Sequence, residues 1–263
     1  MRAVTSRSSD SLHVEARGTP NGPAVLFLHG FLSCNLQWEL HRPAFDGALR
    51  WFAAELWGHG SSPTPSDPRA YGAEGYIEAF EAARRAFGVE RWVVVGQSLG
   101  AGLMMRYALA HPEAVRGLAL TNSRSAFSQV TSAESSPSLE NIRRADLRTL
   151  PVHPCHAQRF PADLRERMAL AADRVDRTAL WRAITETTRS TCCRDVAAKL
   201  SLPVLLVNGV RERAFQEHRD FAAAVIPGIR VVDFDGGHAV NVEAPREFEA
   251  ALLELALSAD ARR

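Results

Sequence analysis

The stretch VVVGQSLG, Val93–Gly100, decides the fold that we expect of this chain. Three consecutive valines predict a strand buried on both faces, and apolar residues recur at helical spacing from Leu99 to Ala110. Ser98 therefore stands where a strand turns at once into a helix. Such a turn imposes a positive φ on its central residue and leaves no room for a Cβ two positions away on either side, where this chain has Gly96 and Gly100. The stretch is typical of a nucleophile elbow, Gly-x-Ser-x-Gly.

The rest of the chain must support this interpretation, because a serine between two glycines at this spacing arises by chance about once in a dozen chains of this composition. Further apolar runs predict an edge strand and five more strands, at Ser11–Arg17, Ala24–Leu28, Arg50–Leu56, Val115–Thr121, Pro203–Gly209 and Ile229–Phe234. Helical patterns separate most of them. Repeated strand-helix units predict an α/β chain with a doubly wound, mainly parallel sheet and helices on both faces.

The regular alternation stops between residues 124 and 199, where the sequence is polar and prolines interrupt helical patterns. These patterns fall near Leu139–Leu150, Ala162–Val175 and Thr178–Thr188. We therefore expect a core made of residues 1–123 and 200–263, with residues 124–199 inserted as a helical cap. Within the cap, the serine-rich stretch Ser132–Ser138 is expected to be flexible.

Composition excludes several classes of function. The chain has 263 residues with 46% hydrophobic and 23% charged composition, and its formal net charge of +1 argues against a nucleic-acid or membrane-surface partner. The polar first residues lack a secretory signal and no apolar run reaches transmembrane length, so we expect a cytoplasmic protein. The four cysteines lack metal-ligand spacing, so we expect free thiols and no metal site.

Three residues of the types found in catalytic triads follow three of the predicted strands. Ligands of such sheets bind at the carboxyl ends of the strands, where this chain has Ser98, Glu212 and His238. A serine needs a neutral imidazole to take its proton, and the imidazole needs a carboxylate to fix its tautomer and stabilise its charged form. The sequence therefore predicts a catalytic triad of these three side chains.

Five ordered motifs span nearly the whole chain: HGF at 29–31, ELWGHGSS at 55–62, GQSLG at 96–100, GVRE at 209–212 and GGH at 236–238. In these motifs the chain resembles the α/β-hydrolase fold superfamily, and within it the serine hydrolases that carry a cap. The resemblance implies a sheet of about eight strands and an oxyanion hole formed by the backbone N–H groups of Phe31 and Leu99. It also implies a small-molecule substrate and no cofactor, and a homodimer is compatible with it.

The sequence departs from the family pattern at two positions. The usual acid of the family is Asp, whereas this chain has Glu212, so Asp235 is kept as the alternative acid and Asp233 as a less favoured one. Trp57 stands where relatives commonly have Arg, and either core packing or a place near the pocket would explain it. The histidines at 29 and 59 are expected to be structural.

The function expected from the triad is hydrolysis of a small, largely apolar ester, lactone or thioester through an acyl-enzyme. Ser98 argues against the aspartate nucleophile of epoxide hydrolases and haloalkane dehalogenases of this fold. One alternative is a carbon-carbon bond hydrolase or specialised biosynthetic enzyme, for which Arg143, Arg144 or Arg148 could bind a substrate carboxylate. A second alternative is a ligand sensor with little turnover. Candidate pocket residues are Phe31, Leu32, Trp38, Phe127, Ile142 and Trp181.

Overall fold

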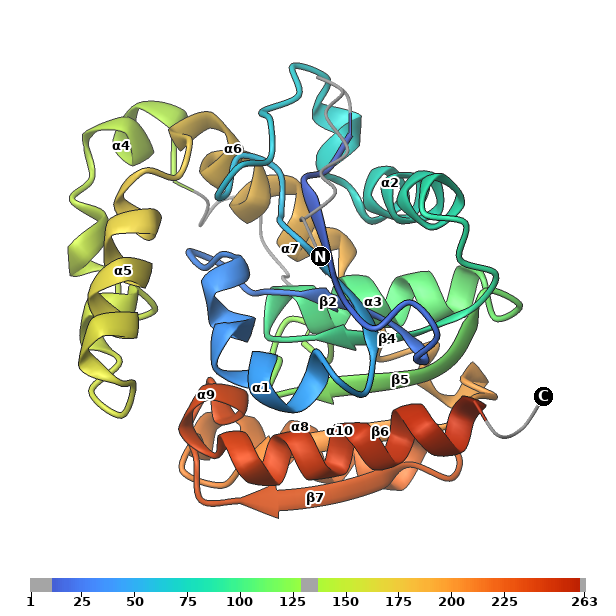
Figure 1. Cartoon of the computed structure of the whole chain (residues 1–263). Helices are drawn as coiled ribbons and strands as arrows, with labels where there is room; N and C mark the ends of the chain where they lie inside the picture. The colour runs from blue at the N-terminus through green and yellow to red at the C-terminus, as the bar shows by residue number, and fades with distance from the viewer. Residues whose placement is uncertain (1–10, 129–136, 261–263) are drawn as a thin grey trace.

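A seven-stranded sheet with the order β1-β3-β2-β4-β5-β6-β7 forms the centre of the molecule (Figure 1). The computed structural model describes residues 11–128 and 137–260. Its strands are β1 (Val14–Gly18), β2 (Ala24–Leu28), β3 (Arg50–Ala54), β4 (Trp92–Gly96), β5 (Val115–Thr121), β6 (Val204–Gly209) and β7 (Arg230–Phe234). All neighbours pair in parallel except β1, which lies antiparallel to β3 at the sheet edge. The described residues thus hold one strand fewer than the expected eight or so, because only β1 precedes β2 there.

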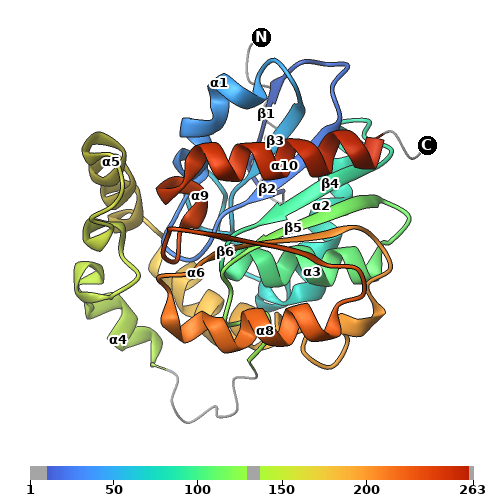
Figure 2. The same cartoon turned by 90° about the horizontal axis from the view of Figure 1, so that it is seen from below.

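Alternate residues of the central strands pack into two separate cores. Leu26 and Val94 belong to one apolar cluster, and Phe27 and Val95 belong to the other, as the period of two in a strand requires. Helices α2 (Ala73–Ala86), α3 (Leu99–Ala110) and α8 (Gln216–Val225) cover the first face. Helices α1 (Arg42–Phe45), α9 (Val240–Glu243) and α10 (Pro245–Asp260) contribute to the core on the second face. Figure 2 shows α1 and α10 on one side of the sheet and α3 and α8 on the other.

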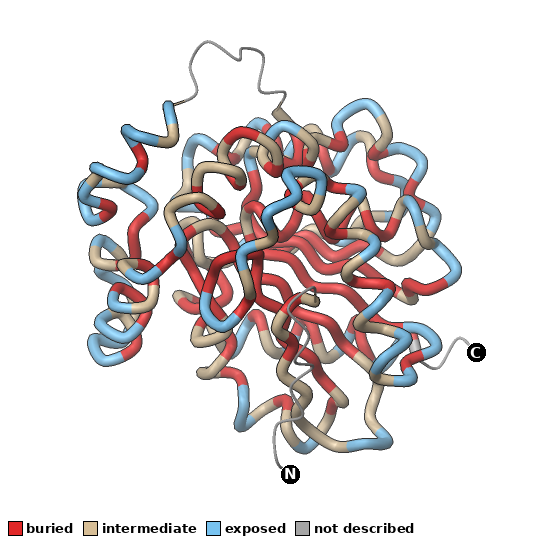
Figure 3. The backbone as a smooth tube through the Cα atoms, turned by 90° about the horizontal axis from the view of Figure 1, so that it is seen from above, coloured by how far each residue is buried: buried red, intermediate tan, exposed pale blue. Residues whose placement is uncertain are grey.

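The backbone of the sheet is buried throughout its centre, as the tube coloured by burial shows (Figure 3). All five residues of β4 and all six of β6 are buried. This explains why their sequences are continuous apolar runs rather than alternating ones, since helices cover both faces. The strand that leads to Ser98 therefore lies at the buried centre of the fold.

The chain between β5 and β6 contains helices and no strand in its described part. The α-helices are α4 (Leu139–Arg144), α5 (Ala162–Asp173), α6 (Arg177–Arg182) and α7 (Thr188–Ser190), with a π-helical turn at Ala183–Thr187. Figure 1 shows α4 and α5 set apart from the sheet, on the side to which the β7 arrow points. The helix expected over 139–150 is interrupted after Arg144. Ala145 is extended (ψ 137°), and Asp146 caps a separate short 3-10 turn, Leu147–Thr149.

Two further expectations from the sequence concern a serine-rich stretch and membrane-spanning segments. Most of the serine-rich stretch expected to be flexible, residues 132–136, lies outside the described residues. Among the residues that the structure describes, none of the helices has both the length and the apolar character needed to cross a bilayer.

Candidate active site

Ser98 occupies the turn between β4 and α3 with φ 53° and ψ −119°. This conformation is unfavourable for a residue with a side chain and persists only where the surrounding structure enforces it. The enforcement comes from close backbone packing: a Cβ on Gly100 would lie 2.5 Å from the carbonyl oxygens of Leu28 and His29. The strained turn lifts the Ser98 hydroxyl away from the buried strand, and the residue is partly exposed.

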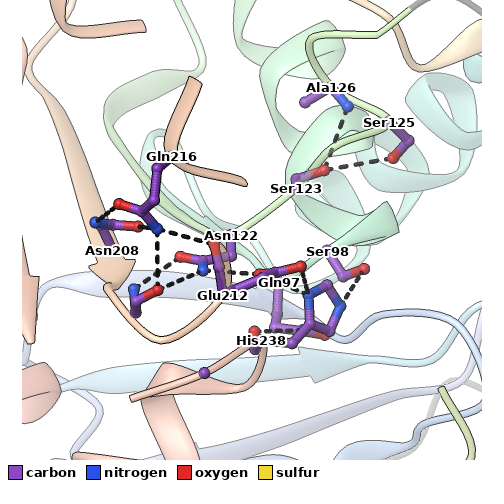
Figure 4. A network of polar contacts seen from close by, with 12 residues as sticks. Gln97, Ser98, Asn122, Ser123, Ser125, Ala126, Asn208, Glu212, Gln216 and His238 are labelled. Atoms are coloured by element: carbon purple, nitrogen blue, oxygen red, sulfur yellow. Dashed lines mark hydrogen bonds and ion pairs between the residues drawn. The ribbon is translucent and has the colours of Figure 1, made fainter. Parts of the chain in front are cut away.

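The structure brings Ser98, His238 and Glu212 into one chain of contacts (Figure 4). The distance from His238 Nε2 to Ser98 Oγ is 2.9 Å, and His238 Nδ1 lies 2.9 and 3.0 Å from the two carboxylate oxygens of Glu212. His238 is 42% exposed at its side chain, whereas Glu212 is 17% exposed. The imidazole can therefore donate from Nδ1 to the carboxylate and accept the hydroxyl proton at Nε2.

The buried side-chain amide of Asn122 also holds the Glu212 carboxylate. Asn122 Nδ2 donates to Glu212 Oε2 at 2.8 Å and to the carbonyl of Gly209 at 3.1 Å, and Asn122 Oδ1 accepts from the N–H of Gly209 at 2.9 Å. Burial alone would raise the pKa of Glu212, but the hydrogen bonds from His238 and Asn122 outweigh it and lower that pKa below its usual value. Glu212 is thus an anion at neutral pH.

The alternative acids make other contacts. Asp235 is exposed and pairs with Arg211 through both carboxylate oxygens. Asp233 is bound by Asn208 and Arg219. The structure therefore places Glu212, and not either aspartate, against His238.

The two backbone donors expected at an oxyanion hole are available. Neither the Phe31 N–H nor the Leu99 N–H has a hydrogen-bond partner within the described residues. Both residues line the same cavity as Ser98. In the loop after β2, Leu32 has a positive φ of 53°, a strained conformation that the surrounding structure must enforce. The Gln97 amide of the elbow donates to the carbonyl of His238 at 3.3 Å.

His29 and His59 are fully buried around the adjacent turn, with ring centroids 5.6 Å apart. Burial lowers the pKa of His29 to about 3 and that of His59 to about 4, so both rings are neutral. His29 Nδ1 lies 2.7 Å from the carbonyl of Gly30, and its Nε2 accepts from the Leu56 N–H. Trp57 is also buried, donates to the carbonyl of Ala70 and does not line the cavity above Ser98.

A cavity of about 600 Å³ lies above Ser98. The strand-end loops supply one wall, which includes Phe31, Leu32 and Leu99. The helical segment between β5 and β6 supplies the other, which includes Val152, Phe160, Met168 and Ile184. The cavity therefore joins the reactive hydroxyl to a largely apolar space, which suits a small organic ligand.

Four of the expected pocket residues lie elsewhere. Trp38 packs on the opposite face of the sheet against Phe27, at a ring distance of 4.9 Å. Phe127 packs against Phe221 of α8. Ile142 and Trp181 belong to an apolar cluster in which helices of the insertion pack with one another and with Phe31 and Leu32 of the loop after β2. None of these four side chains lines the cavity above Ser98. Sequence alone does not separate such roles, because aromatic and branched side chains serve core packing as well as ligand contact.

The three arginines proposed to bind a carboxylate do not reach the cavity. Arg144 pairs with Glu140 and Arg148 pairs with Asp173, and Arg143 is exposed outside the cavity wall.

Other residues in the wall escaped the sequence reasoning. Arg124 lines the cavity just beyond the end of β5, and the loop that contains His153, Pro154 and His156 closes it from the insertion. In the described residues, no group of three or more His, Cys, Asp or Glu side chains is arranged to hold a metal ion.

Comparison with known proteins agrees with this architecture. Residues 23–171 match the family model for the alpha/beta hydrolase fold. The chain is 31% identical over 110 residues to epoxide hydrolase 3 of Xenopus tropicalis, in an alignment that covers 42% of this chain and 30% of that protein. The chain spans about a third or less of the curated relatives it matches.

Solved structures resemble the chain over almost its full length. A hydrolase from Pseudomonas aeruginosa has a TM-score of 0.81 at 24% identity, covering 97% of this chain and 98% of that one. An enol-lactonase from Burkholderia xenovorans LB400 has a TM-score of 0.78 at 21% identity, covering 94% and 96%. With a family model matched over more than half of its length, and with the sheet and elbow described above, this chain belongs to the α/β-hydrolase fold family.

Proposed function

We propose that this protein is a serine hydrolase that cleaves a small, largely apolar ester, lactone or thioester. The single observation that carries the proposal is the contact chain from Ser98 Oγ through His238 to Glu212, at 2.9 Å for each step. A serine hydroxyl alone is a weak nucleophile, and this arrangement supplies the base and the orienting anion that activate it.

The proposed reaction has two halves. His238 Nε2 takes the proton of Ser98 Oγ as the oxygen attacks the carbonyl carbon, and the N–H groups of Phe31 and Leu99 stabilise the oxyanion. Collapse of the tetrahedral intermediate breaks the bond to the leaving oxygen or sulfur, which takes the proton from His238. Water then gives a proton to His238 as its oxygen attacks the acyl carbonyl carbon. The second tetrahedral intermediate collapses by breaking the bond between the acyl carbon and Ser98 Oγ, and His238 returns the proton to Oγ as the acid is released.

We further propose that residues 124–199 act as a cap that determines which substrates fit. The support is that this segment supplies one whole wall of the cavity, including Phe160, Met168 and Ile184. A space of about 600 Å³ with these side chains suits a compact apolar acyl or alcohol group. The similarity in fold to an enol-lactonase agrees with a cyclic or short-chain ester.

Epoxide hydrolysis is not favoured, although an epoxide hydrolase is among the relatives. Enzymes of this fold that open epoxides are expected to need an aspartate at the elbow, where this chain has Ser98. The carbon-carbon hydrolase alternative loses the support of the three arginines of the insertion, since none of them lines the cavity.

Hydrolysis of short para-nitrophenyl esters tests the proposal. The wild-type protein is expected to release nitrophenol with saturation kinetics, and Ser98→Ala should reduce kcat at least about a thousandfold. Ser61→Ala, which removes an exposed hydroxyl outside the cavity, is the matched control and should retain activity. Equal turnover by wild type and Ser98→Ala would refute the proposal.

A further inference from the structure

The side chain of Arg124 places a positive charge in the wall of the cavity above Ser98. It follows β5, which is the neighbour of the strand that leads to Ser98, and its side chain is exposed. Its carbonyl accepts from the N–H groups of Phe127 and Ser128 at 3.0 and 2.8 Å, so a turn fixes its backbone. The guanidinium, however, makes no hydrogen bond or ion pair within the described residues.

The two carboxylates of the same wall have hydrogen-bond or ion-pair partners. Glu212 is bound to His238 and Asn122, and Glu243 pairs with Arg159 at 2.8 Å and accepts from the N–H of Gly237.

The histidines that the insertion contributes to this wall also have partners. His153 Nδ1 accepts from the N–H of Cys155 at 3.2 Å, and burial lowers the pKa of His153, which favours its neutral form. His156 Nε2 lies 2.7 Å from the carbonyl of Arg148. Arg124 is therefore the charge of this wall, within the described residues, that is left available to a ligand.

We propose that Arg124 binds a carboxylate of the substrate, so that the preferred substrate is a small ester, lactone or thioester that carries one carboxylate besides the scissile bond. The inference rests on the proposed function and specifies its substrate class. A guanidinium binds a carboxylate through two parallel hydrogen bonds, which positions the ligand as well as attracting it. A singly charged group fits better than a phosphate, because Glu212 and Glu243 in the same wall repel a dianion more strongly.

Arg124 has two conceivable roles: it could bind the substrate, or it could only support Glu212. Its charge helps to lower the pKa of Glu212, so Arg124 could act only by supporting the acid of the triad. In that case its removal would affect every substrate alike. A substrate-binding role instead predicts an effect that depends on the charge of the substrate.

Matched pairs of esters measure this difference. Phenyl hydrogen adipate and phenyl hexanoate have acyl chains of equal length and differ in a terminal carboxylate. The para-butanoyloxybenzoate anion and phenyl butanoate differ in the same way on the alcohol side. For whichever pair places the charge near Arg124, the wild-type kcat/KM for the anionic ester should exceed that for the neutral ester about 10- to 100-fold, as a charge-assisted hydrogen bond gives.

The variants are judged by this anionic-to-neutral ratio and not by absolute rates. Arg124→Gln should bring the ratio down to about one or below, and Arg124→Lys should restore part of it. Arg143→Gln removes the same charge from an exposed site outside the cavity and should keep the wild-type ratio. A ratio that is unchanged in Arg124→Gln for both pairs would overturn the inference, even if absolute rates fall.

A binding measurement keeps the inference testable without turnover. In a Ser98→Ala background, calorimetry should show tighter binding of the anionic than of the neutral ester, and adding Arg124→Gln should abolish the difference. Equal binding of both esters would overturn the carboxylate proposal. Charge-dependent binding together with failure of the wild-type protein to hydrolyse any ester would instead refute the proposed function and leave the anion site supported.

Discussion

Asn122 Nδ2 donates a 2.8 Å hydrogen bond to Glu212 Oε2, and the same amide is bonded to both the N–H and the carbonyl of Gly209. One fully buried side chain therefore ties the end of β5 to the end of β6 and to the carboxylate that faces His238. The extra methylene of a glutamate adds a rotatable bond, and this contact restricts it. We therefore expect Asn122 to act as a positioning residue for the proposed acid.

Asn122→Ala should lower kcat/KM for a para-nitrophenyl ester about 10- to 100-fold, since a hydrogen bond to a charged group is worth roughly 1.5–3 kcal/mol. Asn208→Ala is the matched control, because Asn208 is equally buried at a neighbouring strand position but bonds to Gln216 and Asp233. The control should lose stability, measured by urea unfolding, without a comparable loss of activity. Equal losses of activity in the two variants would assign Asn122 a structural role only.

Glu212→Gln should reduce kcat by roughly a thousandfold or more, because the amide no longer stabilises a protonated His238. Asp235→Asn should change kcat by less than about threefold, because Asp235 is exposed and pairs with Arg211 rather than with His238. Steady-state kinetics of both variants on one ester measures which carboxylate contributes to kcat. The opposite order of effects would transfer the role of the acid to Asp235.

Gly100→Ala should lower the free energy of unfolding by about 1–3 kcal/mol or more, because the new Cβ would meet the carbonyl oxygens of Leu28 and His29 at 2.5 Å. Gly47→Ala offers a control, since nothing lies within 4 Å of a Cβ at that position. Urea denaturation should show a change there of less than about 0.5 kcal/mol. A similar effect of the two substitutions would contradict the tight packing of the elbow.

Acidification should destabilise the protein well above the range in which carboxylates titrate. The pKa values of His29 and His59 are lowered in the folded protein from 6.5 to about 3 and about 4. As the pH falls below 6.5, these two histidines therefore bind protons in the unfolded chain but not in the folded chain, which favours unfolding. Each histidine should reduce the free energy of unfolding by about 1.4 kcal/mol per pH unit between pH 6.5 and its own folded pKa.

Urea unfolding between pH 6 and pH 5 checks this slope. This window lies above 4.5, the ordinary pKa of a glutamate, so Glu15 and Glu81, whose pKa values in the folded protein are about 2, act in the same direction only at lower pH. His59→Gln should make the slope shallower by about 1.4 kcal/mol per pH unit, whatever its effect on absolute stability. An identical slope in the variant would show that His59 is not held neutral.

Much of the fold could be predicted from local sequence patterns. Continuous apolar runs such as Val93–Val95 mark strands that are covered on both faces, and the glycines around Ser98 mark the turn. The proximity of Glu212 to His238 also followed from strand-end topology, because the carboxyl ends of parallel strands meet at one edge of the sheet. Their catalytic roles remain predictions.

The lining of the cavity could not be predicted in the same way. Trp181 and Ile142 have the composition expected of a pocket, yet they form the core of the insertion, because a small helical segment needs its large apolar side chains for its own packing. Arg124 carried no periodic or motif signal. Its proposed role depends on having no hydrogen-bond or ion-pair partner among the residues that the structure describes, and a sequence does not show which charges are paired.

The covalent state of Ser98 tests the central claim most directly. Incubation with a fluorophosphonate, followed by intact-mass and peptide mass spectrometry, should show one added phosphonyl group on the peptide that contains Ser98. Ser98→Ala should remain unlabelled, and Glu212→Gln should be labelled much more slowly. Labelling of the wild type at another residue, or none at all under conditions in which the ester is hydrolysed, would contradict the account.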